Sequence, residues 1–226
     1  MPNERTDATA PAVPAVDRNA LDPATMSYGD AGRTNRRHQR IKAVLARRQT
    51  SLTVVLEDVH DPHNASAVLR SCDAVGILDV HLVYVHQEPP RQSFGRATSA
   101  SAAKWIRLHA WDSVEACYAQ LRGKGFTILA TALDSRSRGV YDVDLVQPTA
   151  LVFGNEKRGV SPEAVAGADG TIYIPMQGMV ESLNISVACA VTLYEAMRQR
   201  LVAGAYDSPS LDDAELARLE TDWLRR

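Results

Sequence analysis

Three polar loops carry the residues whose types and spacing could do chemistry. The first, at 57–64, ends on Asn64 and opens a segment that carries Arg70 six residues later. The second, at 154–159, is bounded by two glycines, which allow unusual backbone angles and close approach of a ligand. The third, at 174–184, holds two methionines and a glycine, which fit an apolar slot for an adenine or a thioether. Each loop also has an ordinary explanation: a capped helix with a solvated arginine, a turn, or a helix cap.

The elements expected around these loops alternate between strands and helices. Continuous apolar runs suit strands that are buried on both faces, and helical patterns lie between them. This alternation predicts an α/β fold with a mostly parallel sheet and helices on both faces. In such a sheet, ligands bind outside the carboxyl ends of the strands, where all three loops lie. The expected strands are 52–56, 80–85, 126–130, 150–153 and 171–174, with a weaker one at 105–108, and the expected helices are 66–75, 113–122, 162–166 and 183–202.

Capping residues indicate where several helices begin. We expect Asn64 to cap the helix of the first loop, and either Ser182 or Asn184 to cap the long helix. Ser210 and Asp213 have the spacing of a capping box, which predicts a separate C-terminal helix. Two of the three cysteines, Cys72 and Cys189, fall in helices among apolar neighbours, so we expect both in the core.

The two ends of the chain differ from its middle. Residues 1–30 are rich in proline and alanine and predict a disordered tail. Residues 31–50 predict a basic amphipathic helix, 51–203 the α/β domain, and 204–226 a C-terminal helical extension. The apolar positions that share a helix face are Ile41, Val44 and Leu45 in the basic helix and Leu216, Leu219 and Trp223 in the C-terminal one.

Composition narrows the class of protein. The chain has 226 residues, of which 45% are hydrophobic, enough for one core. Its net charge of -2 means that any affinity for RNA must come from local patches. Three cysteines without a close pair suit a reduced, intracellular protein. No apolar run reaches the length of a membrane span and the N-terminus lacks a signal core, so we expect a cytoplasmic protein with no membrane contact.

Other chemistries lack their motifs. His60 and His63 could bind a metal, but no third ligand has convincing spacing, so we expect no metal site. The chain has no Gly-x-Ser-x-Gly elbow for a hydrolase and no Gly-x-Gly-x-x-Gly after its first strand. The 154–159 loop lacks the Gly-Lys-Ser/Thr ending of a P-loop.

Taken together, the three loops resemble the three motifs of the SpoU/TrmH family of RNA ribose 2'-O-methyltransferases, in the SPOUT superfamily. The matching segments are 64–70, 153–161 and 174–188, in the family's order. The basic helix, the 195–200 segment, Trp223 and Ser66 resemble the tRNA branch, whose members modify guanosine 18 in the D-loop. The resemblance implies a C-terminal trefoil knot, a homodimer whose knots pack together, tRNA as partner and S-adenosyl-L-methionine as methyl donor. A ribosomal-RNA enzyme and a catalytically silent RNA-binding module are the alternatives.

The resemblance also implies roles for individual residues. Asn64 and Arg70 would lie at the reacting ribose, supported by Glu156, Ser182 and Asn184. The methyl donor would be held largely by backbone groups at Thr131, Gly154, Ile174, Met176 and Leu183.

The family account makes Arg70 a general base, which conflicts with the fact that arginine is always protonated in proteins. We favour a cation that stabilises the developing ribose alkoxide and grips a phosphate, through which the proton leaves. For RNA contacts we predict Arg33, Arg36, Arg37, Arg40, Arg47, Arg48, Arg198 and Arg200. A solvated helix face is the alternative for the N-terminal arginines, and His63 could contact RNA or cap its turn.

Overall fold

The computed structural model describes residues 30–85 and 102–226, with side chains from residue 35 onward. The predicted disordered tail lies outside these residues except for Asp30, and the side chain of Arg33 also lies outside them.

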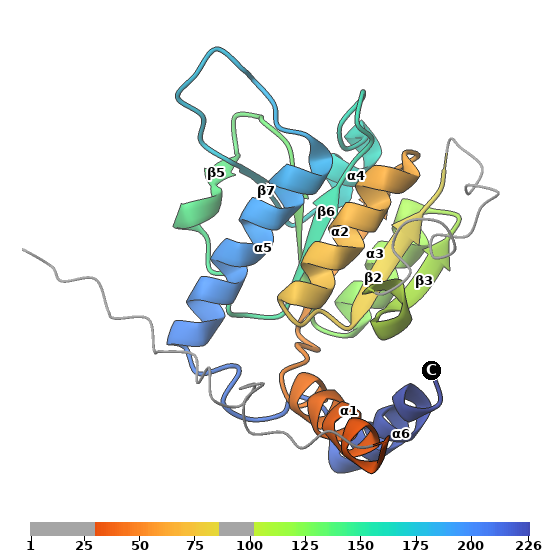
Figure 1. Cartoon of the computed structure of the whole chain (residues 1–226). Helices are drawn as coiled ribbons and strands as arrows, with labels where there is room; N and C mark the ends of the chain where they lie inside the picture. The colour runs from red at the N-terminus through yellow and green to blue at the C-terminus, as the bar shows by residue number, and fades with distance from the viewer. Residues whose placement is uncertain (1–29, 86–101) are drawn as a thin grey trace, which may run out of the picture.

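A parallel sheet forms the centre of the molecule (Figure 1). Among the described residues it has seven strands in the order β3-β2-β1-β6-β4-β7-β5, and every pairing is parallel. The central strands β1 and β6 are buried at every residue, which explains their unbroken apolar runs. The strands are β1 (Leu52–Glu57), β2 (Asp79–Val83), β3 (Arg107–Trp111), β4 (Thr127–Thr131), β5 (Arg138–Gly139), β6 (Thr149–Phe153) and β7 (Gly170–Tyr173).

The predicted mostly parallel α/β sheet is confirmed, with two differences at its edges. Strand β5 has only two residues, Arg138 and Gly139, and carries no apolar run that could have predicted it. Strand β3 begins at Arg107, because Trp105 belongs to a short helical turn, η3 (Ala102–Trp105). As an edge strand, β3 alternates between half-buried and exposed residues, so its pattern is weak.

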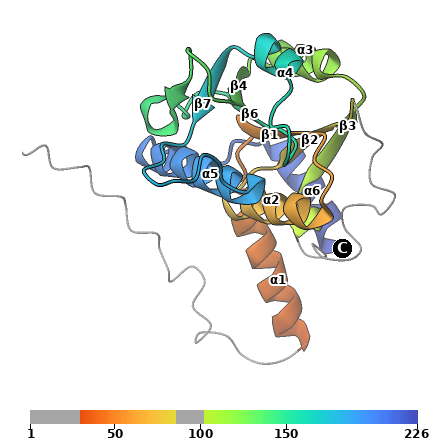
Figure 2. The same ribbon diagram turned by 90° about the horizontal axis from the view of Figure 1, so that it is seen from above.

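Helices cover both faces of the sheet, as predicted (Figure 2). Helices α2 (Pro62–Ala74) and α5 (Ile185–Val202) pack side by side on one face, where Cys72 and Cys189 lie in the core as expected. Helices α3 (Val114–Gly123) and α4 (Pro162–Gly167) cover the other face. A short turn, η4 (Val140–Asp142), follows β5 and contacts α5.

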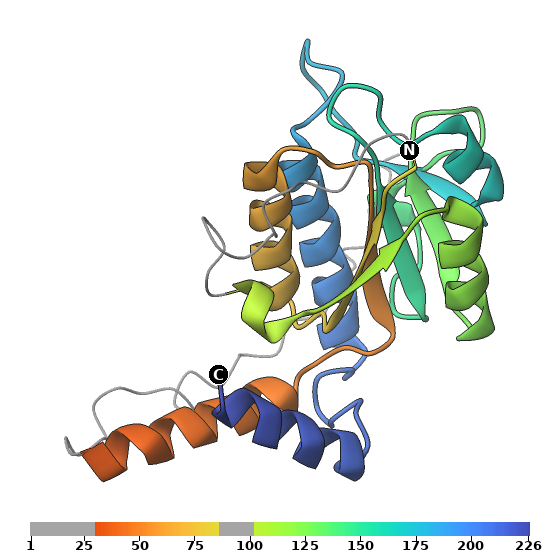
Figure 3. The ribbon, with the colours of Figure 1, turned by 90° about the vertical axis from the view of Figure 1, so that its right-hand side faces the viewer.

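The two remaining helices, α1 (Asp30–Leu45) and α6 (Asp213–Leu224), pack against each other as a helical lobe (Figure 3). Their predicted apolar faces are confirmed: Ile41, Leu45, Leu219 and Trp223 are buried together. The lobe lies at the amino ends of the strands, opposite the loops that follow their carboxyl ends.

Two of the predicted caps are wrong. Helix α2 begins at Pro62, with the Asp61 side chain accepting from the His63 backbone N–H at 2.8 Å, so Asn64 lies inside the helix. Proline suits the first helical position because that N–H needs no partner. At α6 the cap is Asp212, while Ser210 instead donates its hydroxyl to the Arg48 carbonyl.

Candidate active site

The carboxyl ends of β1, β6 and β7 bring the three predicted loops together, and one chain of hydrogen bonds crosses all three. The Asn184 side-chain nitrogen donates to Asn64 Oδ1 at 3.1 Å, and Asn64 Nδ2 donates to Glu156 Oε1 at 3.1 Å. Each residue of this Asn184–Asn64–Glu156 chain comes from a different loop. Their side chains are exposed or half-buried, so a ligand can reach them.

The ends of this chain are held by backbone groups. Asn184 is the N-cap of α5, as one of the two predicted alternatives had it, and its Oδ1 accepts from Ser186 N at 2.8 Å. Glu156 Oε1 also accepts from the Asp61 backbone N–H at 3.4 Å. The first turns of α2 and α5 therefore fix the amide orientations.

The 154–159 loop is fixed by residues that sequence reasoning missed. Asn155 Nδ2 donates to the Asp58 carbonyl at 2.8 Å, and Asn155 Oδ1 accepts from Lys157 N at 2.9 Å. The buried Glu57 carboxylate accepts from the backbone N–H and the hydroxyl of Ser161, at 2.8 and 2.5 Å. An acid that directly follows a buried apolar strand was the available signal for Glu57.

The backbone of the first loop turns sharply at Asp58, whose φ of 49° lies in the left-handed region. Its side chain accepts from Val85 N at 3.0 Å and pairs with Arg158 at 3.4 Å. Burial and the charge of Asp58 raise the pKa of Tyr84, so this phenol stays neutral.

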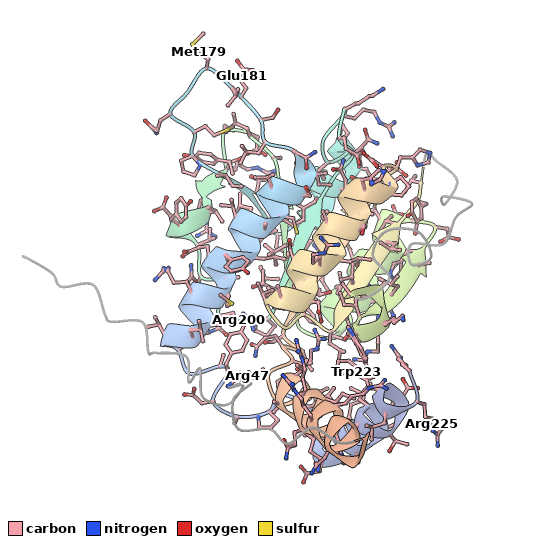
Figure 4. The ribbon with its side chains drawn as sticks, viewed as in Figure 1. Arg47, Met179, Glu181, Arg200, Trp223 and Arg225 are labelled. Carbon is pink, nitrogen blue, oxygen red and sulfur yellow. The ribbon has the colours of Figure 1, made fainter. Side chains whose placement is uncertain are left out.

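A cavity of about 580 Å³ lies between the second and third loops and the ends of β4 and β7. Gly154 lines it, and a Cβ there would lie 2.1 Å from the Gly159 backbone, so only glycine lets this loop close. Met179 does not line the cavity: it is fully exposed at the tip of the third loop (Figure 4), so only Met176 remains of the expected methionine slot. The predicted site residues on the cavity wall are Thr131, Gly154, Glu156, Ile174, Met176, Ser182, Leu183 and Asn184.

Arg70 lies outside this wall, on the exposed side of α2. It stands six residues after Asn64, about 1.7 turns or about 9 Å along the helix axis at 1.5 Å per residue. Within residues 30–85 and 102–226 its guanidinium has no hydrogen-bond or ion-pair partner. As far as the described residues go, Arg70 is therefore free to bind a group outside the protein.

Most of the predicted RNA-contacting residues are on the surface. Arg36, Arg37 and Arg40 are exposed on α1, and Arg47 follows the helix end. His63 is exposed beside Asn64, and exposed Arg198 pairs with Glu195 at 2.7 Å.

Arg48 and Arg200 were predicted to contact RNA, and the structure contradicts both because their side chains are fully buried. Helix α1 ends at Leu45, so the helical spacing that grouped Arg48 with the exposed arginines does not extend to it. Arg200 lies at the base of α5 (Figure 4) and donates to the carbonyls of Leu145, Ser51 and Gln147 at 2.9–3.0 Å. Burial lowers the pKa of both arginines.

In the described part of the chain, no helix is long and apolar enough to cross a membrane. The same residues hold no group of three or more His, Cys, Asp or Glu side chains that could bind a metal ion.

A parallel sheet with three polar loops and a cavity at the carboxyl ends of its strands is typical of an α/β enzyme, and comparison with known proteins gives the family. The model of the SpoU rRNA Methylase family matches residues 51–194, so the chain belongs to that family.

Three relatives illustrate the similarity. The tRNA (guanosine(18)-2'-O)-methyltransferase of Thermus thermophilus is 51% identical over 194 residues, which cover 86% of this chain and 98% of the relative. The crystal structure of the A. aeolicus TrmH/SpoU tRNA modifying enzyme has a TM-score of 0.78 and 38% identity, covering 85% of this chain and 96% of that one. AviRb from Streptomyces viridochromogenes, solved with AdoMet, has a TM-score of 0.61 and 25% identity, covering 70% and 62%.

Proposed function

We propose that this protein transfers a methyl group from S-adenosylmethionine to the ribose 2'-hydroxyl of guanosine 18 in the tRNA D-loop. The relative from Thermus thermophilus, 51% identical over 86% of the chain, has this activity in its name. The observation that carries the proposal is the Asn184–Asn64–Glu156 chain, which joins the three loops beside the cavity.

The cavity fits the methyl donor. Its volume of about 580 Å³ falls within the range of roughly 300–1,000 Å³ that is usual for cofactor sites. We assign the donor to Thr131, Gly154, Ile174, Met176 and Leu183, whose small or apolar groups suit a ligand held largely by backbone atoms. When bound, S-adenosylmethionine supplies a methyl group that its sulfonium already activates.

The remaining task of the protein is to orient the ribose and to remove its proton. Arg70 stays protonated, so it acts as a cation that stabilises the developing 2'-alkoxide and grips a neighbouring phosphate. The proton leaves through that phosphate. Asn64 orients the ribose, and Glu156 and Asn184 fix both ends of its amide. Ser182, on the cavity wall, is the remaining residue that we propose for the catalytic site.

The surface cations would hold the rest of the tRNA. Exposed arginines bind phosphates and give strong salt dependence. Since tRNA is the proposed substrate, we place the protein in the cytoplasm. The residues proposed for these contacts are Arg33, Arg36, Arg37, Arg40, Arg47, His63 and Arg198.

We also propose the knot and the homodimer that the family resemblance implies. Strand β6 lies between β1 and β4, and β7 lies between β4 and β5, so the chain crosses back on itself after β5. Val187 and Tyr194 leave an exposed apolar strip on α5, which supports a self-association surface there. Analytical ultracentrifugation should give twice the mass of one chain. Replacing Val187 and Tyr194 by glutamate should lower the measured mass.

Transfer of labelled methyl to an unmodified tRNA transcript tests the substrate. We expect label on the transcript with guanosine at position 18 and loss of label when another base replaces it. Label on ribosomal RNA alone would instead support the ribosomal-RNA alternative. Absence of both label and calorimetric S-adenosylmethionine binding would support the silent RNA-binding module.

A further inference from the structure

The helical lobe stands far from the three loops. Strand β1 separates them by about 20 Å, since its residues rise about 3.3 Å each. Arg36 and Arg40 are exposed on α1 and have no partner in the described part of the chain. Cations at this end lie too far away to touch a ribose held at the Asn184–Asn64–Glu156 chain of the same protomer. They can only hold RNA at a distance, so the orientation of the lobe decides where that RNA meets an active site.

One buried side chain joins the lobe to α2. Arg48 Nη2 donates to Asp73 Oδ1 at 2.5 Å, and Nη1 donates to the Ile77 carbonyl at 2.8 Å. Its guanidinium lies 5.1 Å from the centre of the Trp223 ring in α6. The Arg48 backbone carbonyl also accepts the hydroxyl of Ser210, just before α6. A single residue thus contacts α2, the turn that follows it, and the lobe.

Asp73 balances the buried positive charge of Arg48. Arg48 is fully buried and its Nε has no partner among the described residues, so the Asp73 carboxylate is the group that balances its positive charge. Burial lowers the pKa of Arg48, and the charge of Asp73 acts in the opposite direction. Removing the carboxylate would leave a buried cation unpaired, and the element carrying that cation would have to shift toward water.

Asp73 lies three residues after Arg70 on α2, so the two side chains are neighbours on the same side of the helix. We propose that Arg48 and Asp73 are positioning residues: their pairing sets the lobe against α2, so that tRNA held by the lobe arginines presents its target ribose at the reacting groups. This inference rests on the proposed tRNA methylation. It assigns a function to Arg48 that needs no contact with RNA.

The test is a double-mutant cycle on methyl transfer to full-length tRNA. Asp73→Asn should raise KM about tenfold and leave kcat at saturating tRNA within about twofold. In a chain that already carries Arg36→Gln and Arg40→Gln, the same substitution should change KM by less than about twofold.

Asp222→Asn is the matched control, because it removes the same charge from an ion pair at the end of α6 and should not raise KM. Both substitutions remove a negative charge, which by itself would favour tRNA binding. Weaker tRNA binding by Asp73→Asn therefore cannot be an effect of net charge.

Additive effects in the cycle, or equal behaviour of Asp73→Asn and Asp222→Asn, would overturn the inference. If Asp73→Asn does not fold, Trp223→Leu replaces it, since it removes the lobe side of the same joint and should give the same non-additive pattern. Calorimetric binding of S-adenosylmethionine should be unchanged in every variant. Failure of the wild type to methylate tRNA would count against the proposed function instead.

Discussion

Asn64 uses both atoms of its amide to join the loops, since its oxygen accepts from Asn184 and its nitrogen donates to Glu156. With both amide atoms engaged within the protein, the side chain has one defined orientation before any ligand binds. Preorganised groups of this kind need no rearrangement when the reaction occurs. Arg70 is the opposite case: it is exposed and has no partner among the residues that the structure describes.

This contrast gives a prediction for Arg70. Arg70→Ala should lower kcat for methyl transfer by about 100-fold or more, the usual loss when a preorganised charge stabiliser is removed. Arg70→Lys should lose about tenfold, because lysine keeps the charge but lacks the planar fork that holds an oxyanion and a phosphate together.

Lys124→Ala is the control, since it removes an exposed cation that follows α3 on the other face of the sheet. It should leave the rate unchanged. Near-wild-type turnover by Arg70→Lys would make a specific bidentate role for the guanidinium untenable.

At the scale of elements, the alternation of strands and helices was predictable because the central strands β1 and β6 are buried on both faces. The sheet then places loops that are distant in sequence at one edge, so Thr131, Gly154 and Leu183 share a cavity. Burial of polar side chains was not predictable in the same way. Periodicity cannot distinguish Arg48, which packs against Trp223, from an arginine in water. Nor does composition reveal that Arg200 satisfies the carbonyls of the segments leading into β1 and β6.

The second loop gives a prediction at this scale. Gly154→Ala should weaken S-adenosylmethionine binding by at least about tenfold, because the new methyl group collides with the Gly159 backbone and displaces the cavity wall. Gly178→Ala in the third loop is matched to it, since a Cβ there meets nothing within 4 Å, and should bind as the wild type does. Calorimetric titration measures both, and wild-type affinity in Gly154→Ala would contradict this account of the loop.

At the scale of the whole molecule, the three loops and the basic helix α1 lie at opposite ends of one sheet. A substrate that contacts both must span the length of β1, about 20 Å, which a folded tRNA does. The buried joint at Arg48 gives the lobe a defined position for such a substrate. Free guanosine or a mononucleotide would gain nothing from the lobe.

The most direct test of the central claim is to determine which atom of tRNA receives the methyl group. An unmodified tRNA transcript would be incubated with the protein and S-adenosylmethionine, digested, and its nucleosides mapped by mass spectrometry. We predict a single 2'-O-methylguanosine at position 18. A methyl group on a base, or on the ribose of a different nucleotide, would contradict the account.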